Sequence, residues 1–258
     1  MYYIRLSDDP STDRRASFLS NLTDAISKAC TDLATHPVLS TAPAINALGF
    51  SQGGQFLRAY IERCNVPPVA TLVTFGAQHD GIADFQTCAP TDWVCQGARG
   101  VLRGNTWSGF VQGRFVPAQY FRDPEDLENY LAFSNFLADV NNEREGKNET
   151  YKANLKRLRR FAMFVFGEDE TVVPKESGWF SEVNGTSGVV TRLQDRRMYR
   201  EDWLGLRWLD EQGRLEFREA PGKHMELSDE LLVDAFKRYF GPRAERGLDG
   251  DEVMNRGV

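Results

Sequence analysis

The sequence predicts an α/β fold in which helices cover both faces of a mostly parallel sheet. Strands and helices are predicted to alternate along the chain, which is the pattern of such folds. Residues 161–166 form an unbroken apolar run, as expected for a strand that is covered on both faces. The chain has 258 residues, enough for one large α/β domain or two small ones.

The first part of the chain contains three predicted strands and two amphipathic helices. A short strand is expected at 2–6, and apolar residues at helical spacing predict a helix over 16–34. A buried strand at 44–48 precedes a second helix at 52–63. β-Branched residues predict the next strand at 69–75, so strands and helices alternate up to this point.

Residues 77–160 differ from the rest of the chain, because they are rich in glycine, proline and aromatic residues. We interpret them as a lid-like subdomain inserted into a domain that covers residues 1–240. In this part we expect helices near 125–141 and 149–160. After it we expect strands at 161–166 and 215–219 and a closing helix at 229–240. The charged, glycine-rich residues 241–258 are expected to form a disordered tail.

Composition excludes several classes of protein. Lys and Arg number 31 and Asp and Glu 37, so the formal net charge is 31 − 37 = −6, which argues against a nucleic-acid partner. No apolar run approaches the roughly 18 residues that a membrane-spanning helix needs. The chain has three histidines and no CxxC pair, so we expect no metal site. We also expect no organic cofactor and a monomeric protein.

The strongest motif is G-x-S-x-G, formed by Gly49, Ser51 and Gly53 between a predicted strand and a predicted helix. In this position it is typical of the nucleophile elbow of the α/β-hydrolase fold, where a sharp turn exposes the serine above the sheet. The backbone N–H of Gln52 is then expected to stabilise an oxyanion at the helix N-terminus. The alternative is a chance match in a glycine-containing turn.

A serine needs a base, and in this fold the chain order is serine, acid, histidine. His36 precedes Ser51, and His79 precedes every plausible acid turn. His224 follows the predicted strand 215–219, in the loop where such a fold places its base. Order therefore assigns the base to His224, and a solvated loop histidine is the alternative.

The acid is expected after the strand at 161–166, where three carboxylates are adjacent. Glu168 and Glu170 are expected to be solvated surface charges. Asp169 has a shorter side chain and lies at the centre of the turn, so we expect it to hold the imidazole in one tautomer.

Cysteines and glycosylation sequons favour the secretory pathway. The cysteines are Cys30, Cys64, Cys88 and Cys95, which allow three pairings if they are oxidised. N-x-S/T sequons begin at Asn21, Asn148 and Asn184. The N-terminus contradicts this assignment, because residues 1–6 lack the basic start and apolar run of a signal peptide.

Several motifs of the chain occur together in one known family. They are GFSQGGQFLRA at 49–59, GAQHDG at 76–81, FLADVN at 136–141, NETYK at 148–152, DWLGL at 202–206 and GKHMELS at 222–228. In this order they resemble the lysosomal palmitoyl-protein thioesterases over roughly residues 2–240. GFSQGG alone is less specific, because cytosolic acyl-protein thioesterases share it, but those enzymes lack a long insertion like 77–160.

The resemblance implies an α/β-hydrolase that releases long-chain fatty acyl groups, such as palmitoyl, from S-acylated cysteines of proteins or peptides. It implies the triad Ser51, Asp169 and His224, which chain order also predicts. An acyl-binding groove in the insertion and a structural role for His79 are further implications.

The same resemblance implies the disulfides Cys30–Cys64 and Cys88–Cys95, glycosylation at the sequons, and a location in the lumen of the lysosome or vacuole, or outside the cell. Family members carry a signal peptide, a first core strand and a His-Gly loop that donates the second oxyanion N–H before the part present here. We therefore expect an N-terminally truncated member of the family. An oxygen-ester lipase or esterase, or a catalytically impaired binding protein, remain the alternatives.

Overall fold

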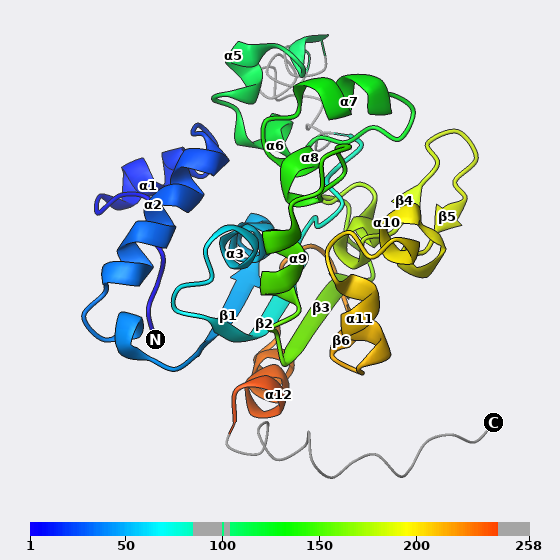
Figure 1. Ribbon diagram of the computed structural model, residues 1–258. Coiled ribbons are helices and arrows are strands. Elements are labelled where there is room, and N and C mark those ends of the chain that lie inside the picture. Colours follow the sequence, from blue (N-terminus) through cyan, green and yellow to red (C-terminus); the bar gives the residue numbers. More distant parts are fainter. Residues whose placement is uncertain (85–99, 101–103, 242–258) are drawn as a thin grey trace, which may run out of the picture.

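A computed structural model describes residues 1–84, 100 and 104–241. Within these residues, four parallel strands form the central sheet in the order β1-β2-β3-β6 (Figure 1). The strands are β1 (Ile45–Phe50), β2 (Val69–Phe75), β3 (Arg160–Phe166) and β6 (Leu215–Ala220). This topology confirms the predicted α/β fold, and parallel pairing places the carboxyl ends of all four strands at one edge of the sheet.

Helices cover both faces of the sheet. Successive residues of a strand point to opposite faces, so each strand contributes side chains to both layers of helices. Phe161 and Met163 of β3 pack with the side of the sheet covered by α3 (Gln52–Arg63) and α9 (Glu149–Leu155). Ala162 and Phe164 belong to the other cluster, which includes Tyr239 of α12 (Asp229–Tyr239). Both faces of β3 are therefore apolar, which explains its unbroken apolar sequence.

Between β2 and β3 the chain forms short helices that lie beyond the carboxyl ends of the strands (Figure 1). They are α5 (Gly109–Gln112), α6 (Val116–Gln119), α7 (Leu127–Phe133) and α8 (Leu137–Val140), followed by α9. Val116, Tyr130 and Phe136 from this part pack against Ile26 of α2 (Leu22–Thr35) and Ala59 of α3. The short helices thus pack against α2 and α3, which cover the sheet, rather than against the sheet itself.

The remaining elements are small and lie mostly at the periphery. They are α1 (Pro10–Ala16), η1 (Leu39–Thr41), η2 (Lys175–Trp179), the antiparallel pair β4 (Glu182–Val183) and β5 (Val190–Thr191), η3 (Leu193–Asp195), α10 (Arg197–Arg200) and α11 (Leu206–Glu211). No helix in the described ranges is both long and apolar enough to cross a membrane.

Three predicted elements differ from the structure. Residues 2–6 are not a strand, because the backbone N–H of Leu6 donates to the Asp13 carboxylate, 2.7 Å away, instead of to a strand. The predicted helix 16–34 begins only at Leu22, as α2, since the side chain of Asn21 caps its N-terminus, and α1 ends where the predicted helix was expected to begin. The predicted helix near 125–141 is divided into α7 and α8.

A disulfide joins Cys30 of α2 to Cys64, the residue that follows α3, with a Cα–Cα distance of 5.9 Å. It links the helix before β1 to the helix after it, the pairing that the family resemblance implies. Cys88 and Cys95 lie outside the described residues. The same holds for the predicted tail 241–258, apart from Gly241.

Candidate active site

Ser51 lies in a strained turn between β1 and α3, as the elbow motif predicts. Its φ is +48°, a region that residues other than glycine rarely adopt and that costs on the order of 1–3 kcal/mol. The turn is tight enough that a Cβ on Gly49 would lie 2.6 Å from the Cα of Gly54. The backbone N–H of Ser51 donates to the carbonyl of Phe75, 2.7 Å away, which holds the turn at the carboxyl edge of the sheet.

The structure brings Ser51, His224 and Asp169 together from three separate loops. His224 Nε2 lies 2.9 Å from the Ser51 hydroxyl, and His224 Nδ1 lies 2.7 Å from Asp169 Oδ2. An ionised carboxylate accepts hydrogen bonds only, so a neutral imidazole here carries its proton on Nδ1, and Nε2 accepts a hydrogen bond from the Ser51 hydroxyl. This is the geometry of a general base next to a serine nucleophile.

Asp169 is held more firmly than the two glutamates beside it. Its Oδ1 accepts the backbone N–H groups of Thr171 and Val172, both at 2.9 Å, and its side chain is only 2% exposed. Glu168 and Glu170 are exposed. The turn after β3 therefore directs one of three adjacent carboxylates toward the imidazole.

Gly76, which directly follows β2, makes room for the imidazole. A Cβ at this position would lie 3.0 Å from Cε1 and 3.1 Å from Nδ1 of His224, and the φ of Gly76 is +58°. The ring of Phe166 lies on another side of the imidazole, with 6.2 Å between centroids. Sequence analysis did not single out Gly76, although its position after a predicted strand was a visible signal.

Gln52 is the first residue of α3, as the elbow prediction requires. The first N–H groups of a helix have no acceptor within the helix, and the helix dipole favours negative charge at this end. The N–H of Gln52 is therefore suited to bind an oxyanion that forms on an acyl group attached to Ser51.

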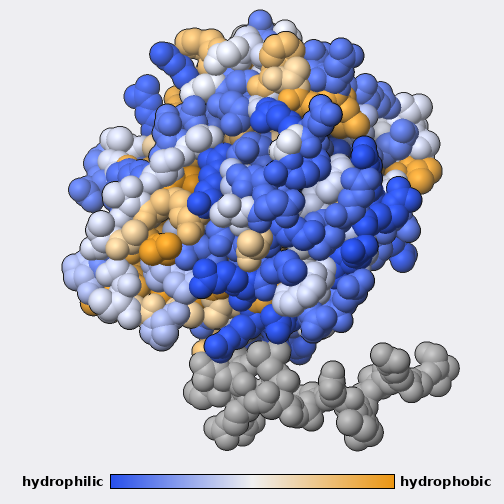
Figure 2. Space-filling model, in the orientation of Figure 1, coloured by the Kyte–Doolittle hydropathy of each residue, from blue (hydrophilic) through white to orange (hydrophobic). Residues whose placement is uncertain are grey.

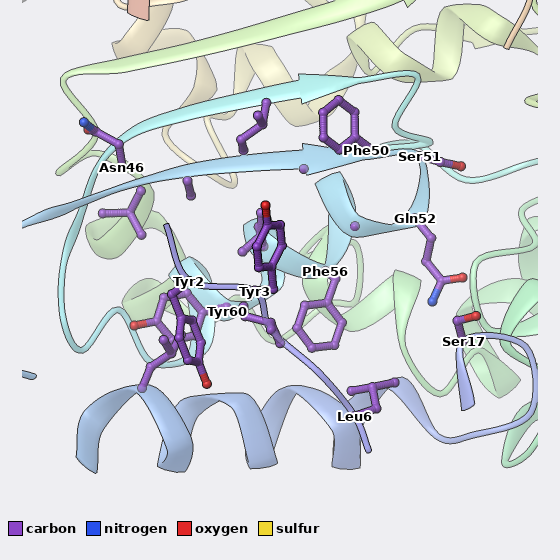
Figure 3. A pocket seen from close by; sticks show the side chains of 18 of the residues that line it. Tyr2, Tyr3, Leu6, Ser17, Asn46, Phe50, Ser51, Gln52, Phe56 and Tyr60 are labelled. Carbon is purple, nitrogen blue, oxygen red and sulfur yellow. The ribbon is translucent and has the colours of Figure 1, made fainter. Parts of the chain in front are cut away.

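A cavity of about 1710 Å³ opens beside the three residues, and Ser51 and His224 lie on its wall. Figure 3 shows Ser51 and Gln52 at one end of β1 and Asn46 at the other, with Tyr2, Tyr3 and Leu6 of the N-terminal segment across the cavity. The region 77–160 contributes Gln78, Ile82, Pro117 and Tyr120 to the lining. Much of the apolar wall comes from β1, α3 and residues 1–6 instead, which the sequence did not indicate.

Two predicted non-catalytic histidines have structural roles. His79 is fully buried and stacks on Phe180, with 5.0 Å between ring centroids, and burial holds its pKa well below the usual value. It is therefore neutral and lies away from the position of the base. His36 ends α2, where its Nδ1 accepts the backbone N–H groups of Val38 and Leu39.

A buried ion pair supports the loop after β2. The guanidinium of Arg58 lies 2.7 Å from the Glu62 carboxylate and donates to the carbonyl of His79 at 3.1 Å. It also donates to the side chain of Asn141 at 2.7 Å, which connects α3 to the end of α8. Burial raises the pKa of Glu62 to about 7, although Arg58 opposes the shift.

A second buried charge cluster connects this loop to more distant segments. Asp80 pairs with Arg196 at 2.6 Å and with Arg122 at 3.3 Å. Arg122 also pairs with Glu182 at 2.6 Å and with Glu143 at 3.2 Å. Burial raises the pKa of Asp80 to about 6. Sequence analysis missed this cluster, whose members are far apart along the chain.

The described residues hold no group of three or more His, Cys, Asp or Glu side chains arranged to bind a metal ion. The sequons lie at or near the surface. Asn148 and Asn184 are exposed, whereas Asn21 is half-buried at the N-terminus of α2.

Known proteins resemble this chain in sequence. "Palmitoyl-protein thioesterase 1" of Caenorhabditis elegans is 37% identical over 242 residues, which cover 93% of this chain and 80% of the relative. "Palmitoyl-protein thioesterase 3" of Dictyostelium discoideum is 38% identical over 201 residues, 77% of this chain and 66% of the relative. "Lysosomal thioesterase PPT2 homolog" of Drosophila melanogaster is 28% identical over 183 residues, 70% of this chain and 62% of the relative.

The chain thus spans four fifths of the length of the nematode relative and slightly less than two thirds of the other two. A family model described as "Palmitoyl protein thioesterase" matches residues 1–224, which include Ser51, Asp169 and His224. With a match over most of its length and the elbow in place, the chain belongs to the palmitoyl protein thioesterase family.

Proposed function

We propose that this chain hydrolyses long-chain fatty acyl thioesters on S-acylated cysteine residues of proteins or peptides. The observation that carries the proposal is His224, whose two ring nitrogens connect Ser51 at 2.9 Å with Asp169 at 2.7 Å. A histidine that is held by a carboxylate and accepts a hydrogen bond from a serine activates that serine for attack on a carbonyl carbon. Membership of the family supports the thioester as the bond that is cleaved.

In the first half of the reaction, Ser51 Oγ attacks the thioester carbonyl carbon while His224 Nε2 takes the hydroxyl proton. Asp169 keeps the imidazole oriented and stabilises the imidazolium that forms. The backbone N–H of Gln52 binds the oxyanion of the tetrahedral intermediate. The carbon–sulfur bond then breaks, and the sulfur receives the proton from Nε2. The cysteine thiol departs, and Ser51 remains acylated.

In the second half, water replaces the thiol. His224 Nε2 takes a proton from the water as its oxygen attacks the acyl carbon, and returns it to Ser51 Oγ when the acyl–serine bond breaks. The products are a fatty acid and the free serine, so no cofactor is consumed.

The cavity beside Ser51 is the proposed acyl site, because Ser51 lies on its wall and the side chains that line it are largely apolar. Each methylene that leaves water contributes about 0.8 kcal/mol, so long chains are favoured over short ones. Ile82 and Pro117 of the region 77–160 share this role with Phe56 of α3 and Leu48 of β1, which also line the cavity.

The test is turnover of the purified chain on an S-palmitoyl cysteinyl peptide and on the matching serine oxygen ester, together with labelling by a fluorophosphonate. We expect thioester cleavage and labelling at Ser51, and neither in Ser51→Ala. Faster cleavage of the oxygen ester would instead assign the chain to the esterases. If the folded protein is not labelled by the fluorophosphonate and cleaves neither ester, the chain is a binding protein and not an enzyme.

We further propose that the protein works in the lysosomal lumen and carries glycans at Asn148 and Asn184. The exposure of both sequons and the Cys30–Cys64 disulfide support a secretory route. Expression through the secretory pathway should give a product whose mass falls on glycosidase treatment. Asn148→Gln and Asn184→Gln should each remove one glycan, and an unchanged mass would contradict the assignment.

A further inference from the structure

Large apolar side chains are exposed to solvent near the cavity, in the turn after α1 and on α5. Phe18 and Leu19, in the turn after α1, are 58% and 45% exposed, and Phe110 of α5 is 62% exposed. Phe18 also lines the cavity that holds Ser51. Single exposed apolar residues are normal, but a group of them beside a binding site marks an interaction surface.

Contacts across the chain join these residues into one surface. The carbonyl of Phe18 accepts the backbone N–H of Val116 at 3.0 Å, and Leu19 forms an antiparallel bridge with Phe115. The ring of Phe115 lies 6.3 Å from that of Phe110. Figure 2 shows hydrophobic surface over α5 and along the opening between α2 and α3.

Arginines surround these apolar side chains, although the whole chain has a net charge of −6. Arg14 and Arg15 lie exposed in the last turn of α1, and the guanidinium of Arg114 lies 4.8 Å from the centroid of the Phe110 ring. The acidic side chains of this segment lie toward the other end of α1, where Asp9 caps the N-terminus and the Asp13 carboxylate accepts the backbone N–H groups of Leu6 and Ser7. We call this surface the docking rim, and it consists of Arg14, Arg15, Phe18, Leu19, Phe110, Arg114 and Phe115.

We propose that the docking rim binds the surface of a lipid bilayer that carries anionic headgroups. Aromatic and aliphatic side chains with arginines beside them are suited to a membrane interface, where the apolar groups enter the acyl boundary and the guanidinium groups contact phosphates. The positive charge of the rim is complementary to such a surface. A second copy of the chain is the competing occupant, and the test distinguishes it.

Docking would place Phe18 and Arg14, which line the cavity, at the surface of the bilayer. An acyl chain could then pass from the bilayer to the cavity without crossing water, which would spare the cost of exposing its methylenes. This consequence rests on the proposed thioesterase function, whereas the docking itself does not.

The test is sedimentation of the full chain with vesicles of phosphatidylcholine alone or with about one third phosphatidylserine. We expect binding to the anionic vesicles that is weaker on neutral vesicles and weakened by high salt, since salt screens the arginines. Because no turnover is measured, a chain that failed to hydrolyse thioesters would still give an answer here.

Two pairs of rim substitutions separate the contributions. Arg14→Glu with Arg15→Glu should lower binding to anionic vesicles more than about tenfold. Phe18→Ser with Phe110→Ser should lower it several-fold. The matched controls are Arg157→Glu, an exposed arginine near the start of β3, and Val233→Ser, which is 49% exposed on α12. Both should bind like the unmodified chain.

The proposal is overturned if the unmodified chain ignores anionic vesicles, or if folded rim variants bind as well as the controls. It is also overturned if the unmodified chain is a dimer that Phe18→Ser with Phe110→Ser dissociates, because a second copy would then cover the rim. Circular dichroism establishes that each variant is folded, and the exposed arginine pair can be replaced without disturbing the core.

Discussion

At the scale of single residues, Asp169 is distinguished from its neighbours by two backbone N–H groups that fix its carboxylate. We predict that Asp169→Asn lowers kcat/KM about 10⁴-fold, because an amide no longer selects the imidazole tautomer that can accept the serine proton. Glu168→Gln and Glu170→Gln are the matched controls and should change kcat/KM several-fold at most. A larger loss of kcat/KM in Glu168→Gln than in Asp169→Asn would show that Glu168, not Asp169, orients the imidazole.

Gly76 is a second residue whose role depends on geometry alone. Gly76→Ala is expected to lower kcat/KM about 10²-fold, since the new Cβ would displace the His224 ring that lies 3.0 Å away. Gly146→Ala is the control, because a Cβ there meets nothing within 4 Å. Steady-state kinetics on the palmitoyl peptide measure the effect. Equal rates in the two variants would show that the imidazole tolerates the shift.

At the scale of elements, the Cys30–Cys64 disulfide connects α2 to the end of α3 across 34 residues of sequence. Replacing both cysteines by alanine should lower the free energy of unfolding by about 3–4 kcal/mol, mainly because the unfolded chain gains freedom. Urea unfolding of the unmodified and double-variant proteins, both under oxidising conditions, measures the difference. A difference below about 1 kcal/mol would mean that packing alone holds the two helices.

Peptide mapping under non-reducing conditions tests the pairing of the remaining cysteines. We expect a Cys88–Cys95 peptide beside the Cys30–Cys64 peptide in protein from the secretory pathway. A mixed pairing such as Cys30–Cys88 would contradict both assignments and weaken the lysosomal proposal.

At the scale of the whole molecule, two buried carboxyls predict how stability depends on pH. Burial raises the pKa of Glu62 to about 7 and that of Asp80 to about 6, above the ordinary values of 4.5 for glutamate and 3.8 for aspartate. The native state therefore binds more protons than the unfolded state between about pH 4 and 7. Their contribution to stability is fully present below pH 4 and is lost as the pH rises through 6 and 7.

We predict that Glu62→Gln makes the free energy of unfolding less dependent on pH between about pH 5 and 7.5, by an amount on the order of 2 kcal/mol. Denaturant unfolding at both pH values measures this change in slope. Glu168→Gln, an exposed carboxyl, is the control and should leave the slope as it is. A slope that Glu62→Gln does not alter would show that Glu62 titrates alike in both states.

Several features of the site were predictable because their signals are local. The glycines around Ser51 are required by a turn of a few residues, and the order of Ser51, Asp169 and His224 along the chain follows from the topology of the fold. The strand at 161–166 was recognisable from its own apolar residues. The structure of the N-terminal segment was not, since the aromatic and aliphatic residues at 2–6 suit a strand but the Asp13 carboxylate accepts the backbone N–H groups of Leu6 and Ser7 instead.

The sequence by itself therefore determined the class of fold and the family to which the chain belongs, and it predicted Ser51, Asp169 and His224 as site residues. Only the tertiary structure showed that Asp169, and neither of the glutamates beside it, contacts His224, and that Glu62 and Asp80 are buried beside arginines. It also decided that the N-terminal segment with Tyr2, Tyr3 and Leu6 forms a wall of the cavity, and that the carbonyl of Phe18 accepts the backbone N–H of Val116. The physical reason is that these features depend on contacts between segments far apart in the chain, which no local period or motif encodes.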